Sequence, residues 1–135
     1  MITYRTGNDV DLEAVVDLYV DSTLGERRPV DDRERMARML AEANLVLTAW
    51  EGTLLVGISR SITDWVYCTY LSDLAVRTDY QGRGIGRELV RLTREATPHA
   101  TVILLAAPQA VDYYPRIGMT RHESAWVLLP GEFPV

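Results

Sequence analysis

The spacing of apolar residues predicts two amphipathic helices near the start of the chain. The first begins near Asn8 or Asp9, either of which can cap it, and its apolar face carries Leu12, Val15, Val16 and Tyr19. The second is capped by Asp31 or Asp32, and its apolar face carries Met36, Met39, Leu40 and Ala43. Residues 2–5 are β-prone, so a short strand is expected ahead of both helices.

β-Branched and aliphatic residues dominate the middle of the chain, which indicates strands. Residues 45–50 and 54–62 are two such stretches, and Glu51-Gly52-Thr53 between them is typical of a tight hairpin turn. Residues 67–76 form a third candidate strand. Because consecutive strands usually lie side by side, the three are expected to pair as an antiparallel meander.

The second half of the chain predicts a strand–helix–strand crossover. A helix begins inside a glycine-rich segment, carries Ile85, Leu89, Leu92 and Ala96 on one face, and ends at Pro98. Residues 101–106 form a continuous apolar run, which is typical of a strand covered on both faces. A short helix from Pro108 through Tyr114 follows, and residues 119–129 are expected to form one or two further strands.

These elements predict a single α/β domain over residues 1–135. Antiparallel hairpins and a crossover occur together, so the sheet should be mixed, with helices on both faces. We expect a twisted sheet of six or seven strands and about four flanking helices. The length agrees, since 135 residues is a common size for one domain.

Composition removes several classes of function. The net charge is −5, which disfavours a nucleic-acid binder, and all 14 basic residues are Arg, so the chain has no side-chain amine of its own to acylate. Cys68 is the only cysteine, which excludes an internal disulfide and a cysteine metal cluster, and no metal site is expected. No apolar run approaches the ~20 residues of a membrane helix, and no secretory signal is recognised. We therefore expect a cytoplasmic protein without a membrane or nucleic-acid partner.

The segment Gln81-Gly82-Arg83-Gly84-Ile85-Gly86 is the strongest chemical signal, because it joins a strand to a helix. Amides in the first helical turn have no partner within the helix, and glycines let them approach a phosphate. The nucleotide-hydrolase phosphate loop requires a Lys that this chain lacks. The dinucleotide fingerprint requires a different glycine spacing after the first strand of its unit.

The same segment resembles the Gln/Arg-x-x-Gly-x-Gly/Ala signature of the GNAT superfamily of acyl-CoA-dependent N-acetyltransferases. Its flank Asp73-Leu74-Ala75-Val76 is similar to the end of that family's fourth strand. Residues 110–119, Ala-Val-Asp-Tyr-Tyr-Pro-Arg-Ile-Gly-Met, resemble the family's later helix–turn signature. The resemblance covers nearly the whole chain and implies the GNAT fold, with acetyl-CoA as cosubstrate and an amine as acceptor.

The resemblance also implies roles for individual residues. The backbone at Leu74 and Val76 would pair with the pantetheine arm in a gap where the fourth and fifth strands diverge. The backbone N–H groups of one continuous segment would hold the pyrophosphate, namely those of Gln81, Gly82, Arg83, Gly84, Ile85, Gly86 and Arg87. Tyr114 would lie beside the thioester sulfur, where a positioned tyrosine can protonate the departing thiolate.

The general base is left open by the sequence. Some members of the family carry Glu just before the position of Asp73, whereas this chain has Ser72 there. Asp73 is the nearest carboxylate, and it is equally compatible with a structural hydrogen bond at a strand bulge. Asp64, Glu123 or a chain of water molecules are alternatives. The acceptor pocket is expected from residues 24–32, the loop around Asp64 and Trp65, and the C-terminal strands.

The sequence is compatible with two further hypotheses. One is a non-catalytic sensor or regulatory module of the same fold that binds acyl-CoA without turnover, which the absence of the strand Glu favours and Tyr114 disfavours. The other is a homodimer that pairs through residues 126–129, because this apolar segment is suited to the edge of a sheet.

Overall fold

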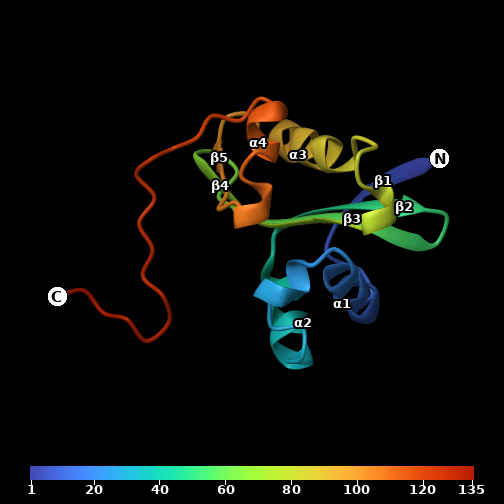
Figure 1. Ribbon diagram of the computed structural model, residues 1–135, viewed down its shortest axis with the longest axis horizontal. Helices are drawn as coiled ribbons and strands as arrows, with labels where there is room; N and C mark the ends of the chain where they lie inside the picture. Colours follow the sequence, from blue (N-terminus) through green and yellow to red (C-terminus); the bar gives the residue numbers. More distant parts are fainter. The chain divides into compact units, whose positions relative to one another are not determined.

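The computed structural model describes residues 1–135, and its strands form one mixed five-stranded sheet in the order β1-β2-β3-β4-β5 (Figure 1). The strands are β1 (Ile2–Thr6), β2 (Leu45–Glu51), β3 (Leu54–Thr63), β4 (Cys68–Val76) and β5 (Thr101–Ile103). The helices are α1 (Leu12–Asp21), α2 (Arg33–Glu42), α3 (Ile85–Ala96) and α4 (Tyr113–Arg116). The chain divides into two compact units, residues 1–105 and residues 106–135.

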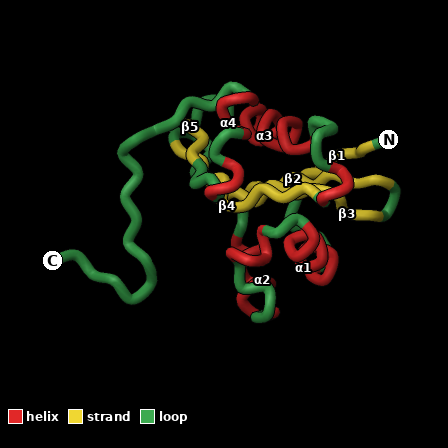
Figure 2. The backbone as a smooth tube through the Cα atoms, in the orientation of Figure 1, coloured by secondary structure: helices red, strands yellow, loops and turns green.

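In the first unit the sheet separates two hydrophobic cores. Helices α1 and α2 lie on one face of the sheet, and α3 lies on the other (Figure 2). Tyr19, Met36 and Ile58 belong to the core beneath α1 and α2, whereas Leu47 and Leu89 belong to the core beneath α3. The meander is confirmed, since β2–β3 and β3–β4 pair antiparallel, and β4–β5 is the parallel pair.

The helix caps agree only in part with the sequence prediction. Asp32 caps α2, as expected, by accepting a hydrogen bond from the backbone N–H of Arg35 at 3.1 Å. The prediction for α1 was wrong, because its cap is Asp11, which accepts from the N–H of Ala14 at 3.2 Å. Asn8 instead donates its side-chain amide to carbonyl oxygens at the end of α2, those of Leu40, Ala41 and Ala43.

Strand β5 is shorter and more exposed than predicted. It covers three residues rather than 101–106, and Ile103 retains 52% of its accessible surface. The expectation of a strand covered on both faces was therefore wrong. The apolar run identified a strand, but apolarity alone does not determine what covers it.

The second unit departs furthest from the sequence prediction. A 3-10 turn (Pro108–Ala110) and the short helix α4 replace one helix, and Pro115 lies inside α4 rather than ending it. Residues 119–129 contain no strand, so the sheet has five strands where six or seven were expected. The apolar run at residues 125–129 is compatible with a strand, but a strand also needs a neighbour to accept its backbone hydrogen bonds. No helix of the protein has the length and apolar character required to cross a membrane.

Candidate active site

The segment between β4 and α3 turns sharply at two glycines. Gly82 has φ +77° and Gly84, the residue at the N-cap of α3, has φ +82°. Only glycine adopts this left-handed conformation without strain. No side chain caps α3, and its first helical hydrogen bond runs from the N–H of Glu88 to the carbonyl of Gly84. The first-turn amides of Ile85, Gly86 and Arg87 therefore face the start of the helix, where the helix dipole favours an anion.

Contacts to α1 hold this segment in place. Arg77 donates to the carboxylate of Asp17 at 2.6 Å and to the carbonyl of Leu55 at 2.7 Å. Thr78 is bound twice by Asp21, since its N–H donates to the carboxylate and its hydroxyl to the backbone carbonyl, both at 2.9 Å. The approach to the glycine turn is thus fixed before any ligand binds.

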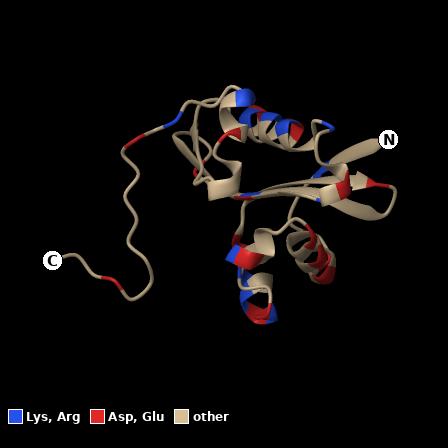
Figure 3. Ribbon diagram, viewed as in Figure 1, with Lys and Arg blue, Asp and Glu red and all other residues tan.

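The arginines of α3 and of the glycine turn before it have different partners. Arg91 pairs with Glu88 and Glu95 along the exposed face of the helix, and Arg94 donates to backbone carbonyls at the helix end. Both residues have a structural role. Arg83 lies closer to the turn, with its guanidinium 4.6 Å from the ring centre of Tyr80. Figure 3 shows the alternating charges along α3.

Strand β4 has a free edge beside this segment. Strand β5 pairs with it only from Cys68 to Tyr70, so the two strands diverge beyond that point, as expected. Leu74 and Val76 lie on the diverging part, and their side chains pack into the core beneath α3. The carbonyl of Val76 accepts a hydrogen bond from the side-chain amide of Gln81 at 3.0 Å. The strand edge and the glycine turn are therefore directly connected.

Asp73 is at the centre of a buried hydrogen-bond cluster on the other face of β4. Its carboxylate accepts from Arg28 Nε, Arg60 Nε and the Tyr19 hydroxyl, each at 2.6 Å, and from the Ser72 hydroxyl at 3.1 Å. Ser72 is the extra residue of a β-bulge, because Arg60 faces Asp73 while the next residue of β3 faces Leu71. The cluster ties α1, the segment before α2, and strands β3 and β4 together.

The electrostatics of this cluster keep Asp73 ionised. Burial by itself would raise its pKa, but hydrogen bonds and charge from Arg60, with contributions from Tyr19 and Arg28, lower the pKa below its usual value. For Tyr19, burial and the negative charge of Asp73 raise the pKa well above the usual range, so its hydroxyl stays protonated. Asp73 has 0% exposed surface, and this arrangement favours the structural alternative over a proton-accepting role.

The other two carboxylates considered as a base have different environments. Asp64 accepts backbone hydrogen bonds from Val66, Tyr67 and Cys68 at 2.8–3.0 Å, and these bonds lower its pKa. It therefore shapes the turn that carries Trp65, a residue with φ +73°. Glu123 is exposed in the second unit.

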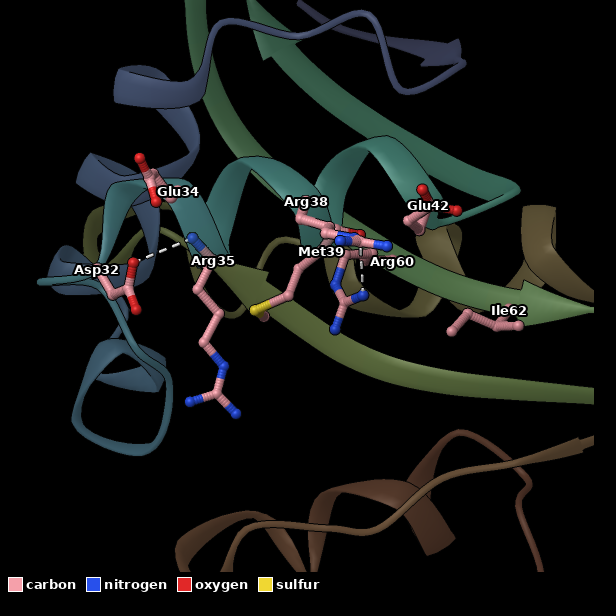
Figure 4. A pocket seen from close by; sticks show the side chains of 8 residues that line it. All are labelled: Asp32, Glu34, Arg35, Arg38, Met39, Glu42, Arg60 and Ile62. Carbon is pink, nitrogen blue, oxygen red and sulfur yellow. Dashed lines mark hydrogen bonds between the residues drawn. The ribbon is translucent and has the colours of Figure 1, made fainter. Parts of the chain in front are cut away.

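A cavity of about 550 Å³ opens between α2 and β3 (Figure 4). Its lining residues come from the cap and exposed face of α2 and from the outer part of β3, namely Asp32, Glu34, Arg35, Arg38, Met39, Glu42, Arg60 and Ile62. The acceptor pocket was expected from residues 24–32, the loop around Asp64 and Trp65, and the C-terminal strands, and of these residues only Asp32 lines the cavity. Arg60 was the residue that could have indicated this cavity from the sequence, because an arginine in a buried strand requires a partner or a function.

Tyr114 lies in the second unit, at the start of α4. Its ring meets that of Tyr113 edge to face, with 5.2 Å between the ring centres. Burial, and then Tyr113, raise the pKa of the Tyr114 hydroxyl above its usual value, so the group is protonated at neutral pH. No three His, Cys, Asp or Glu side chains of the protein are grouped so that they could hold a metal ion.

Comparison with known proteins agrees with this geometry. Residues 18–127 match a family model described as an acetyltransferase (GNAT) domain. A curated relative, the uncharacterized N-acetyltransferase ycf52 of Porphyra purpurea, is 29% identical over 73 residues, which are 51% of this chain and 41% of the relative. The chain thus spans about two fifths of the length of that relative.

Solved structures share the fold over almost the whole chain. A GNAT family acetyltransferase from Streptococcus pneumoniae has a TM-score of 0.76 and 25% identity, covering 95% of this chain and 98% of its own. An aminoglycoside acetyltransferase from an uncultured soil metagenomic sample, in complex with sisomicin, has a TM-score of 0.69 and 21% identity, covering 95% and 94%.

Proposed function

The chain belongs to the GNAT acetyltransferase domain family, and on that premise we propose that it transfers an acetyl group from acetyl-CoA to an amine. The amine attacks the thioester of acetyl-CoA directly, within a ternary complex. Residues 1–135 act as a single N-acetyltransferase domain. The observation that carries this proposal is the glycine turn at the start of α3, which contacts to α1 hold in place beside the free edge of β4.

The coenzyme site follows from these two features. The pyrophosphate binds the backbone N–H groups from Gln81 to Arg87, where the unpaired amides and the helix dipole favour negative charge. The pantetheine arm pairs with the backbone of Leu74 and Val76, because β5 leaves this edge of β4 unoccupied. The side-chain amide of Gln81 must leave the carbonyl of Val76 so that this carbonyl can pair with the pantetheine arm.

The chemical step needs one proton donor and one proton acceptor. The amine nitrogen attacks the thioester carbonyl carbon, a C–N bond forms, and the C–S bond breaks. Tyr114 gives its hydroxyl proton to the departing thiolate, and its raised pKa keeps that proton available. A backbone N–H of β4 stabilises the charge that develops on the carbonyl oxygen. Water removes the proton of the amine. Asp73 is fully buried, and hydrogen bonds from three backbone amides lower the pKa of Asp64, so both are poor proton acceptors.

Measuring thiol release from acetyl-CoA with a panel of small amines tests this function. Wild type should release thiol only when an amine is present. Tyr114→Phe should lower kcat by about 10²-fold or more, since general acid catalysis contributes that much. Tyr113→Phe is the matched control and should retain activity. Equal rates for the two variants would remove Tyr114 from the mechanism.

A sensor that binds acyl-CoA without turnover is the second candidate, and Ser72 at the strand position where some family members carry Glu favours it. Calorimetric binding of acetyl-CoA with no thiol release across the amine panel would support the sensor. Amine-dependent release would exclude it.

The apolar C-terminal segment is the basis for a proposed homodimer. Residues 126–129 are exposed, with Trp126 92% accessible, and pairing at the edge of a sheet would cover them and add strands to the five observed. Sedimentation should show a concentration-dependent dimer that Trp126→Asp weakens. A monomer at all concentrations would reject this proposal.

A further inference from the structure

The buried cluster around Asp73 contains more positive than negative charge. Arg28 and Arg60 both bind its carboxylate, and no other ion pair involves either arginine. Tyr19 is neutral because its pKa is raised well above the usual range. One carboxylate thus faces two guanidinium groups, which leaves one positive charge without a partner. A charge that is withdrawn from water is unfavourable unless it is paired.

Both guanidinium groups retain free hydrogen-bond donors. Each arginine has five N–H groups. Arg28 uses three, for Asp73, the carbonyl of Ser72 and the carbonyl of Arg27. Arg60 also uses three, for Asp73, the carbonyl of Met39 and the hydroxyl of Ser72. Two N–H groups remain on Arg28 and at least one on Arg60, which also contacts the Tyr19 hydroxyl, and a planar guanidinium suits the oxygens of a carboxylate or phosphate.

The cavity gives a ligand access to this charge. Arg60 is only 8% exposed and lines the cavity, whereas Arg28, whose side chain is 20% exposed, does not line it and binds the other oxygen of Asp73. Arg35 and Met39 point to the side of α2 on which Arg60 lies, and Glu34 points away from it (Figure 4). Arg35 and Arg38 form no ion pair within the protein, and the lining carries their charges beside three acidic residues, Asp32, Glu34 and Glu42.

We propose that Arg28 and Arg60 form a subsite for an anionic group of the acceptor, so that the substrate is an amine that also carries a carboxylate or phosphate. This inference rests on the proposed acetyl transfer and specifies its acceptor. Asp73 orients the two guanidinium groups, and the bulge at Ser72 keeps them beside β4. Asp32, an acidic residue of the lining, leaves a place for the ammonium end of the same molecule.

Matched pairs of amines test the subsite. One pair is an amino acid and its amide, and the other is phosphoethanolamine and ethanolamine. Binding is measured by calorimetry in protein saturated with CoA, which cannot react, and kcat/KM is measured separately with acetyl-CoA. The anionic member of at least one pair should bind about 10- to 100-fold more tightly than its neutral partner, as expected for hydrogen bonds to a charged group. The preferred pair identifies the anion.

Variants of two neighbouring arginines separate the subsite from general charge effects. Arg28→Gln removes the surplus charge and should reduce the ratio of kcat/KM for anionic over neutral amine to near one, with CoA affinity unchanged. Arg28→Lys keeps the charge and should retain part of the preference. Arg27→Gln changes the net charge equally, but the Arg27 side chain is exposed and does not contact Asp73, so the preference should persist.

The outcomes of these experiments distinguish the anion subsite from the proposed acetyl transfer. Equal binding of both members in both pairs would overturn the subsite, even if acetyl transfer occurs. A preference that survives Arg28→Gln would also overturn it. Selective binding of anionic amines without any thiol release would support the subsite and contradict the proposed transfer.

Discussion

Replacing Asp73 by Asn separates a structural role of this residue from a catalytic one. The side chains are nearly equal in size, but Asn carries no charge and its NH₂ group cannot accept a hydrogen bond. Asp73 accepts from four side chains, those of Arg28, Arg60, Tyr19 and Ser72. One of these donors would face the NH₂ group, and both guanidinium groups would lose their anion.

The expected loss of stability is large because the cluster is buried. Removing one partner of a buried ion pair typically costs about 3–5 kcal/mol. For a chain of 135 residues, this corresponds to a decrease in Tm on the order of 10–20 °C. A base on the surface of an active site would have no such effect on folding.

Urea unfolding, followed by tryptophan fluorescence and circular dichroism, measures this loss. Asp64→Asn is the matched control, because the Asn side-chain oxygen can still accept from the three backbone amides of the turn. It should change stability by less than about 1 kcal/mol. If Asp73→Asn proves too unstable to purify, Tyr19→Phe removes one donor and should cost about 1–2 kcal/mol. An Asp73→Asn protein as stable as wild type, but inactive, would refute the structural role.

Three further predictions concern packing and pH. Gly57→Ala should lower stability by about 1–3 kcal/mol in urea unfolding, because its Cβ would lie 3.1 and 3.2 Å from side chains of α3; an unchanged midpoint would contradict the close contact. Ser61→Ala should raise stability by about 1 kcal/mol, since the buried Ser61 hydroxyl has no hydrogen-bond partner; a decrease would show that it has one. Asp73 and Asp64 have lowered pKa values in the folded state, so their contribution is complete above the unfolded-state value of about 4 and is lost as the pH falls below it. Acid titration of wild type should therefore show a stronger loss below pH 4 than titration of Asp73→Asn.

Short-range patterns made much of the fold predictable. The glycine turn, the helix that follows it and the β2–β3 hairpin are each encoded within a few residues, so their prediction did not depend on the rest of the chain. The cap of α1 was harder, because Asn8, Asp9 and Asp11 all have side chains that can cap a helix. Asn8 is instead bound to the end of α2, more than 30 residues away.

The Asp73 cluster was beyond local reasoning because its members are distant in sequence. Tyr19 and Arg28 precede Asp73 by 54 and 45 residues, and Arg60 precedes it by 13. The sequence offered a carboxylate at the correct strand, but it gave no sign that two arginines would meet it. A buried-strand arginine is the signal that would have raised the question.

Binding of CoA to the glycine turn is the most direct test of the central claim. Gly84→Asp places a carboxylate at the N-cap of α3, where it would repel the diphosphate, and the positive φ of this position strains the Asp backbone. Gly52→Asp is the matched control, because Gly52 also has a positive φ and open space around it, in the β2–β3 turn. By calorimetry, we expect wild type and Gly52→Asp to bind CoA equally, and Gly84→Asp to bind about 100-fold more weakly or worse, given about 4 kcal/mol of repulsion per pair of charges at 4 Å near a protein surface. Equal affinity of all three proteins, or no binding by folded wild type, would contradict the claim.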